Sequence, residues 1–293
     1  MRKKILITGA NGQLGNELQK LASGYPQLEF FPTDVDTLNL CNKGDIEAFL
    51  NKNPMDYIVN CAAYTAVDKA EDNVGICYEI NRDAVQNIAE SVREQTRIIH
   101  ISTDYVFDGM GKNPLKESDQ TNPQSVYGKS KLAGEQILMK IKPESIIIRT
   151  AWLYSSFGNN FVKTMIRLGE ERDSINVVDD QVGTPTYAAD LAKAILDIII
   201  WDCSGVARNA TITPAGIYHY SNEGICSWYD FAMKIHELAG ITAGKVHPIP
   251  TSEYPTKAKR PMYSVLDKTK IKSTFQIAVP EWEDGLERMM KQQ

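Results

Sequence analysis

The chain has 293 residues, 43% of them hydrophobic and 24% charged, which is enough for one large domain or for a domain with a smaller partner. Acidic residues outnumber basic ones, 37 to 32, and no basic block stands out, so nucleic acid and anionic membranes are not expected as main partners. The five cysteines are scattered without C-x-x-C spacing, and the four histidines are isolated, so neither a disulfide framework nor a zinc site is expected.

The N-terminus and the most apolar segment both argue against a membrane protein. The apolar run in "MRKKILITG" is too short for a signal peptide. The segment "LAKAILDIIIW" (191–201) is interrupted by Lys193 and Asp197 and is too short to span a bilayer, so it is interpreted as a core helix. Together with the odd number of scattered cysteines, this predicts a cytoplasmic location.

The first half of the chain alternates short apolar runs with helical patterns. The runs are rich in β-branched residues and almost continuously hydrophobic, as in strands that are covered on both faces. This alternation predicts an α/β fold, a Rossmann-type doubly wound parallel sheet with right-handed crossovers. Strands are expected at 4–9, 28–34, 57–63, 97–103 and 145–152, and helices at about 14–24, 43–52, 79–95 and 128–141.

The second half is less regular and predicts a smaller C-terminal α/β lobe that binds substrate. A helix is expected near 159–172, a strand at 217–222, and a helix that starts after Ser227 as N-cap and ends at Gly240. The predicted dinucleotide-binding domain comprises residues 1–151 plus about 175–222, and the substrate lobe about 152–174 plus 223–293. The cleft between them is the expected site.

The stretch "ITGANGQLGNEL" joins the first predicted strand to the first predicted helix. Gly9 allows a tight turn, Gly12 lets backbone approach a pyrophosphate, and Gly15 lets helix and strand pack closely. The helix N-terminus offers N–H donors for the phosphates. With a strand before it and a helix after it, this loop predicts dinucleotide binding.

The second predicted strand ends at Asp34, which lies 19 residues after Gly15. A carboxylate about 20 residues after the loop accepts hydrogen bonds from the adenosine ribose and repels a 2′-phosphate. No arginine follows closely, so the sequence favours NADH over NADPH.

Tyr127 precedes Lys131 by four residues in "VYGKSKLAGE", so both project from one face of a helix. A phenol is a poor proton donor unless its pKa, normally near ~10, is tuned, and a neighbouring ammonium favours the phenolate and lowers that pKa. The fourth predicted strand ends in "HISTDYVF", which places Ser102 and Thr103 at the edge of the sheet where such folds bind ligands. Thr103 could hydrogen-bond a substrate carbonyl.

Taken together, these stretches resemble the extended short-chain dehydrogenase/reductase superfamily and, over essentially the whole chain, its dTDP-4-dehydrorhamnose reductase family. The superfamily shares "ITGANGQLG" and "YGKSKLAGE", whereas "AAYTAVDKAE", "STDYVFDG" and "DQVGTPT" are more particular to the reductases. The resemblance implies that NADH or NADPH reduces the C4 keto group of dTDP-4-dehydro-L-rhamnose, the last step in making dTDP-L-rhamnose for cell-wall polysaccharide.

The resemblance also implies roles for single residues. Tyr127 would protonate the sugar O4, Lys131 would tune it, and Thr103 would orient the keto oxygen. The implied substrate contacts are Thr103, Asp104, Tyr127, Trp152, Asn160 and Arg260. The implied cofactor contacts are Gly9, Asn11, Gly12, Gln13, Leu14, Gly15, Asp34, Asn39, Leu40, Ala62, Ala63, Tyr64, Tyr127 and Lys131. Asn39 stands where the family often has an aspartate.

Some members of this family dimerise through a magnesium ion held by glutamates. Glu17 matches one such ligand, but Ala189 and then Asp190 stand where the second is expected. No metal site is therefore predicted, and a homodimer is left open.

Two other functions remain open from the sequence. One is a nucleotide-sugar epimerase or dehydratase of the same superfamily, although Thr103-Asp104 is followed here by Tyr105 and not by the glutamate usual in dehydratases. The other is a non-catalytic regulatory subunit that resembles the β subunit of methionine adenosyltransferase.

Overall fold

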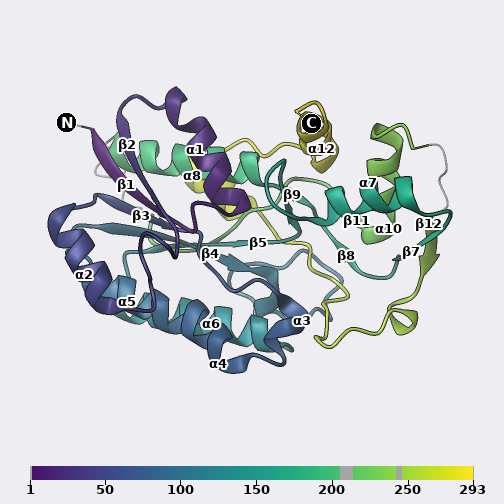
Figure 1. The fold of residues 1–293 in the computed structure, drawn as a ribbon, viewed down its shortest axis with the longest axis horizontal. Helices are drawn as coiled ribbons and strands as arrows, with labels where there is room; N and C mark the ends of the chain where they lie inside the picture. Colours follow the sequence, from purple (N-terminus) through teal and green to yellow (C-terminus); the bar gives the residue numbers. More distant parts are fainter. Residues whose placement is uncertain (1, 205–213, 242–245, 293) are drawn as a thin grey trace.

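The computed structural model describes residues 2–204, 214–241 and 246–292. Six parallel strands form one sheet in the order β10-β5-β4-β3-β1-β2, which confirms the predicted α/β fold (Figure 1). Their bounds are β1 Lys3–Thr8, β2 Leu28–Thr33, β3 Tyr57–Asn60, β4 Arg97–Thr103, β5 Ile146–Thr150 and β10 Gly216–His219.

Alternate residues of these strands point to opposite faces of the sheet, and both faces are buried. Ile5 and Ile7 of β1 face one hydrophobic cluster, whereas Leu6 between them faces another. A strand buried on both faces has to be hydrophobic at successive positions, which explains the continuous apolar runs in the sequence.

Two layers of helices cover these faces (Figure 1). One layer contains α1 (Gln13–Leu21), α8 (Ala188–Cys203) and α11 (Thr269–Phe275). The other contains α2 (Lys43–Lys52), α5 (Ala84–Ser91) and α6 (Val126–Ile141). The core helix predicted around 191–201 is α8, and of the helices that the structure describes none is long and apolar enough to cross a membrane.

The helix predicted at 79–95 differs from the structure. It starts earlier, as α4 (Val74–Tyr78), passes through a π-helical turn at Glu79–Asp83 and continues as α5. Within the turn, Asn81 is fully buried and bonds both backbone groups of Tyr64, accepting from its N–H at 2.8 Å and donating to its carbonyl at 3.1 Å. The irregular turn thus supports the loop that follows β3, at an edge of the future site.

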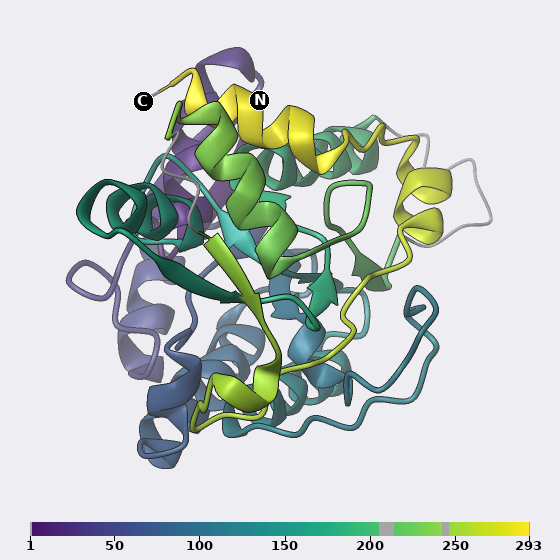
Figure 2. The ribbon, with the colours of Figure 1, turned by 90° about the vertical axis from the view of Figure 1, so that its right-hand side faces the viewer.

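The smaller lobe lies beside the carboxyl ends of the strands (Figures 1 and 2). Its cluster of buried residues includes Tyr154, Val162, Phe231, Ile235 and Leu286. Its elements are β6 Leu153–Tyr154, α7 Phe161–Glu171, β7 Ile175–Val178, β8 Val182–Gly183, β9 Thr186–Tyr187, β11 Cys226–Ser227, α10 Trp228–Leu238, β12 Val246–Ile249 and α12 Trp282–Met290. Short helices complete the chain: η1 Ala22–Gly24, α3 Val67–Ala70, η3 Asp104–Val106 and η4 Thr251–Glu253.

Two details of the lobe bear on the sequence predictions. Ser227 caps α10 as expected, in a capping box with Asp230, and Gly240 follows the helix with φ +66°. β7, in contrast, pairs with β12 and packs on α10, so the predicted placement of residues from about 175 in the dinucleotide-binding domain is wrong for this strand. β7 is only four residues long, and its sequence does not indicate which strand it pairs with.

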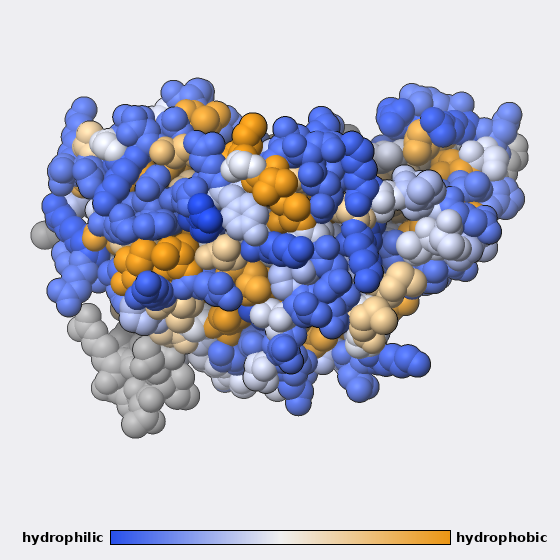
Figure 3. Space-filling view, turned by 90° about the horizontal axis from the view of Figure 1, so that it is seen from below, coloured by the Kyte–Doolittle hydropathy of each residue, from blue (hydrophilic) through white to orange (hydrophobic). Residues whose placement is uncertain are grey.

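The side of the molecule seen from below in Figure 1 is mixed in polarity. Hydrophobic residues form separate groups among hydrophilic ones (Figure 3). Exposed apolar side chains of the described ranges include Val74 and Ile76 of α4. Figure 3 does not single out a partner surface on this side, so the homodimer stays a prediction.

Gly15 gives a test of how tightly α1 must pack on the loop that precedes it. A Cβ at Gly15 would lie 2.5 Å from the Gly9 carbonyl oxygen and 2.6 Å from the Ala10 Cα, both backbone atoms that have no room to move. We expect Gly15→Ala to destabilise the protein by about 1–3 kcal/mol, the usual cost of overpacking, as measured by urea unfolding. The matched control is Gly24→Ala, because no atom lies within 4 Å of a Cβ there. Equal stability of the two variants would show that α1 does not need a glycine at this contact.

Candidate active site

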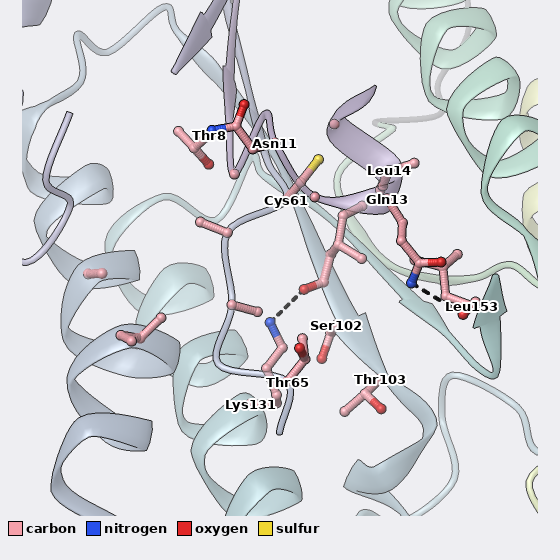
Figure 4. Close-up of a pocket in the computed structure, with 18 of the residues that line it drawn as sticks. Thr8, Asn11, Gln13, Leu14, Cys61, Thr65, Ser102, Thr103, Lys131 and Leu153 are labelled. Carbon is pink, nitrogen blue, oxygen red and sulfur yellow. Dashed lines mark hydrogen bonds between the residues drawn. The ribbon is translucent and has the colours of Figure 1, made fainter. Parts of the chain in front are cut away.

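A cleft of about 850 Å³ opens at the carboxyl ends of β1, β3, β4 and β5 (Figure 4). It brings together most of the residues singled out in the sequence, from the glycine loop to the helix that carries Tyr127. The predicted residues that line it are Gly9, Asn11, Gly12, Gln13, Leu14, Gly15, Asp34, Asn39, Leu40, Ala62, Ala63, Thr103, Asp104, Tyr127, Lys131 and Trp152. Their functional roles stay predictions at this point.

Three predicted residues lie behind the lining. Tyr64 is held through its backbone by Asn81. Asn160 caps α7 and donates its side-chain amide to Gln13 Oε1 at 3.0 Å, so it supports a lining residue. Arg260 forms an ion pair with Asp68 at 2.6 Å and donates to the Tyr105 hydroxyl at 3.2 Å.

The structure also adds lining residues that were not among the predicted contacts, including Thr65, Tyr105, Gly158 and Asn159. Tyr105 packs edge-on against Tyr127, with ring centroids 5.5 Å apart. The sequence signal for Tyr105 was its position two residues after Thr103, at the end of a predicted strand. Gly158 and Asn159 enter the cleft from the loop before α7, next to the predicted Asn160.

The glycine loop has the shape that a dinucleotide phosphate requires. Gly9 has φ +64°, and a Cβ there would lie 2.8 Å from the Ala62 backbone. Gly12 is the N-cap of α1 and presents no side chain at the helix N-terminus. The first amides of α1 therefore face the cleft without obstruction, as anion binding at a helix N-terminus needs.

Asp34 lies immediately after β2, at the far end of this loop. Its carboxylate accepts from the Asn11 N–H at 2.9 Å and from the Val35 N–H at 2.8 Å. Among the described residues that line the cleft, the charged side chains are Asp34, Asp104 and Lys131, so no lining cation stands beside Asp34. The residues present fit a nicotinamide dinucleotide: a tight glycine cradle, a helix N-terminus and a carboxylate at the ribose end.

Tyr127 and Lys131 lie one turn apart near the start of α6. Ser125 caps this helix by accepting from the Gly128 N–H at 3.1 Å. Gly128 lets the helix approach the Tyr105 carbonyl oxygen, which a Cβ at that position would overlap. The first turn of α6 is thus pressed against the end of β4, which carries Thr103.

The direction of the Tyr127 pKa corrects one expectation. Burial raises the pKa of the Tyr127 phenol, the Thr103 hydroxyl lowers it in part, and Asp104 raises it further. The net direction is therefore opposite to the lowering predicted from Lys131, since burial outweighs it. The lysine Nζ donates to the Ile101 carbonyl oxygen at 2.7 Å (Figure 4) and lies 3.3 Å from His100 Nε2. Burial lowers the pKa of Lys131 to about 8, and Glu135 opposes this.

Asp104 is a buried carboxyl group with spare hydrogen-bonding capacity. Its Oδ1 accepts from the Thr103 hydroxyl at 2.9 Å, and the Ser264 hydroxyl also lowers its pKa, whereas Oδ2 makes no hydrogen bond with the described residues. Burial raises the pKa of Asp104 to about 6. An unpaired buried carboxylate oxygen in a cleft is positioned to accept from a hydroxyl of a bound molecule.

Trp152 lies between the cleft and the lobe in a strained conformation. Its φ of 48° is in the left-handed region, which is unusual for a bulky residue. Its ring stacks on Trp228 with centroids 3.7 Å apart, and a Cβ at Gly183 would lie 2.7 Å from it. Trp228 and Gly183 thus pack the Trp152 ring against the lobe. Trp152 therefore has a packing role and also lines the cleft.

The residues that the sequence analysis weighed as magnesium ligands make other contacts here. Glu17 accepts from the Ser155 hydroxyl at 2.6 Å. Asp190 is held by both terminal nitrogens of Arg288, at 2.6 and 2.7 Å, and by Asn222 at 2.7 Å.

The doubly wound parallel sheet, the glycine loop before α1, and the tyrosine and lysine on α6 define an extended short-chain dehydrogenase/reductase. A family model described as the RmlD substrate binding domain matches residues 2–293. The chain is 42% identical to the dTDP-4-dehydrorhamnose reductase of Aggregatibacter actinomycetemcomitans, over 98% of both chains. It belongs to the dTDP-4-dehydrorhamnose reductase family.

Solved structures agree with this assignment. A dTDP-4-dehydrorhamnose reductase from Clostridium acetobutylicum superposes with a TM-score of 0.91 at 46% identity, covering 99% of each chain. The dTDP-4-dehydrorhamnose reductase of Bacillus anthracis, solved in complex with NADP, superposes with a TM-score of 0.92 at 38% identity, covering 100% of each chain.

Asp104 yields a pH-dependent stability prediction. Its pKa is raised from 3.8 to about 6 on folding, so ionising it destabilises the folded state. This free-energy cost is absent at pH values below the pKa of the unfolded state and fully present at pH values above the pKa of the folded state. We expect Asp104→Asn to gain about 3 kcal/mol over the wild type between pH 3 and pH 7, since each pKa unit corresponds to about 1.4 kcal/mol. The comparison is made by urea unfolding at several pH values, with Asp108→Asn, a partly exposed loop residue, as control. A pH-independent difference would show that burial does not raise this pKa.

Proposed function

We propose that this protein reduces the C4 keto group of dTDP-4-dehydro-L-rhamnose with NADH or NADPH, giving dTDP-L-rhamnose. The observation that carries the proposal is the convergence of Thr103, Asp104, Tyr127 and Lys131 at the end of β4, in one cleft with the glycine loop. Three relatives of the same family, similar over nearly their whole length, are dTDP-4-dehydrorhamnose reductases.

In this proposal the nicotinamide, when bound, supplies a hydride to C4 of the sugar. Thr103 and Tyr127 hold the keto oxygen, and Tyr127 gives its phenolic proton to that oxygen as the negative charge develops. The raised pKa keeps Tyr127 protonated at neutral pH, which is the form that a reductase needs. The nearby Lys131 ammonium stabilises the phenolate that remains. Positioning and proton donation account for the chemistry of the protein itself.

The remaining residues would hold the sugar nucleotide. Asp104 Oδ2 is placed to accept from a sugar hydroxyl, and the Trp152 ring offers an apolar surface for the sugar. Arg260 would meet the diphosphate after leaving Asp68, since a guanidinium binds phosphate oxygens in a bidentate manner. Asn160 would act indirectly, by holding Gln13.

We propose NADH as the preferred cofactor, although the Bacillus anthracis relative was solved with NADP. The support is the Asp34 carboxylate at the ribose end of the cleft, without a lining cation to bind a 2′-phosphate. The division into two domains, with β7 moved to the substrate lobe, a cytoplasmic location and a homodimer also belong to this proposal.

The direct test is NADH and NADPH oxidation with enzymatically generated dTDP-4-dehydro-L-rhamnose. We expect turnover by the wild type, and a loss of about 10²–10⁴-fold in kcat for Tyr127→Phe, which removes the proton donor and keeps the ring. Tyr263→Phe is the control. Cofactor binding should persist in both variants. Folded, cofactor-binding wild type that fails to oxidise either cofactor would refute the proposal.

The same assay separates the reductase from the epimerase alternative. A reductase consumes one reduced cofactor for each sugar, whereas an epimerase retains its NAD and returns the hydride. Cofactor that copurifies and is not consumed would therefore favour the epimerase.

Cofactor preference is tested at Asp34. Asp34→Asn removes the charge and keeps one of the two oxygens that accept from the Asn11 and Val35 N–H groups. We expect the ratio of kcat/KM for NADH over NADPH to fall about tenfold, since a charge pair near the surface contributes on the order of 1 kcal/mol or more. Asp36→Asn, an exposed neighbour outside the lining, should leave the ratio unchanged. An unchanged ratio in Asp34→Asn would show that this carboxylate does not discriminate.

A further inference from the structure

A line of buried polar side chains runs beneath the cleft and ends at Lys131. Thr8 of β1 donates to Asn60 Oδ1 at 2.7 Å, Asn60 Nδ2 lies 3.0 Å from His100 Nδ1, and His100 Nε2 lies 3.3 Å from Lys131 Nζ. All four residues are at most 2% exposed. Burying such polar groups between hydrophobic layers costs free energy. The packing of the sheet alone does not explain why they are there.

The hydrogen bonds fix which way the Asn60 amide faces. Its oxygen accepts from the Thr8 hydroxyl at 2.7 Å and from the Ala62 N–H at 3.2 Å. A backbone N–H can only donate, so this end of the amide has to be the oxygen. The amide nitrogen therefore faces His100 and donates to Nδ1.

This arrangement fixes the tautomer of His100. Because Nδ1 accepts, the hydrogen of the neutral ring lies on Nε2, which faces Lys131 Nζ. The ring is fully buried, and both burial and the lysine charge lower the pKa of His100 well below its usual value, so it stays neutral.

An Nε2–H group can bond only one form of Lys131. A neutral amine has a lone pair that accepts the hydrogen, whereas an ammonium has none. Around this amine stand Glu135 on the same helix, Cys61 after β3 and Cys77 on α4, with the Ile101 carbonyl of β4 as acceptor. All of these favour the ammonium, so apart from burial His100 is the specific contact that opposes it.

We propose that His100, oriented by Asn60, is a positioning residue that acts through Lys131, holding Nζ at the Ile101 carbonyl and limiting its affinity for a proton. The inference rests on the proposed reductase, in which the Lys131 ammonium stabilises the Tyr127 phenolate. His100 then sets the upper pH at which reduction still proceeds.

The test replaces the imidazole and follows Lys131 directly. In His100→Leu the neutral amine loses its donor, so the Lys131 pKa should rise by about one unit, the usual effect of one buried hydrogen bond. The 13Cε NMR titration of lysine-labelled protein without substrate measures this, with the Lys131 signal assigned by Lys131→Arg. The alkaline limb of kcat/KM for reduction should move up by the same amount.

Two variants separate a specific effect from a structural one. His100→Gln carries a side-chain N–H near the position of Nε2 and should keep the titration close to that of wild type. His219→Leu removes another fully buried histidine, which contacts the Leu115 carbonyl and not Lys131, and should leave it unchanged. An unchanged or lowered Lys131 pKa in folded His100→Leu would overturn the proposal.

The wild type alone supplies a test that does not depend on folding of a variant. The 15N shifts of the His100 ring distinguish the two tautomers, and we expect the hydrogen on Nε2. A hydrogen on Nδ1 would overturn the proposal. Because both NMR measurements need no turnover, failure of the reductase assay and failure of this inference are distinguishable.

Discussion

The buried ion pair between Glu135 of α6 and Arg149 of β5 is the interaction on which the geometry of the site depends. Arg149 donates through Nε at 2.9 Å and through Nη2 at 2.7 Å, and the Ser102 hydroxyl of β4 donates to the same carboxylate at 2.5 Å. Removing one partner of such a pair costs far more than the pair itself contributes. Its main effect is therefore to specify one register of α6 against β4 and β5.

That register determines what the site can do, because Tyr127, Lys131 and Glu135 follow one another at intervals of four residues along one face of α6. Fixing Glu135 on the sheet thus brings the other two side chains to the end of β4. The helix can come this close only where glycines allow it: a Cβ at Gly134 would overlap the Asn81 carbonyl oxygen. The spacing of four residues between Tyr127, Lys131 and Glu135 therefore places all three on the face of α6 that packs against the sheet.

The sequence predicted those features that depend on local pattern. Strands buried on both faces, the glycine loop and the cap at Ser227 each carry their physical cause within a few residues. The features it missed depend on partners far away in the chain. β7 pairs with β12 about 70 residues on, and Arg260 is held by Asp68. Lys131 was predicted from its spacing to Tyr127, but its contacts with a backbone carbonyl and His100 follow from no spacing rule.

The Arg260–Asp68 pair lies beside Tyr105, which lines the cleft. Arg260 belongs to the segment after η4, and Asp68 lies in the short helix α3, so the pair connects two distant parts of the chain. Both side chains are partly exposed, at 28% and 41%, and such pairs contribute only about 0–1 kcal/mol. A diphosphate offers Arg260 a stronger, bidentate partner. In the proposed function, the exchange of Asp68 for a phosphate would therefore cost little, in contrast to the Glu135–Arg149 pair, which is buried and keeps Tyr127 and Lys131 in place.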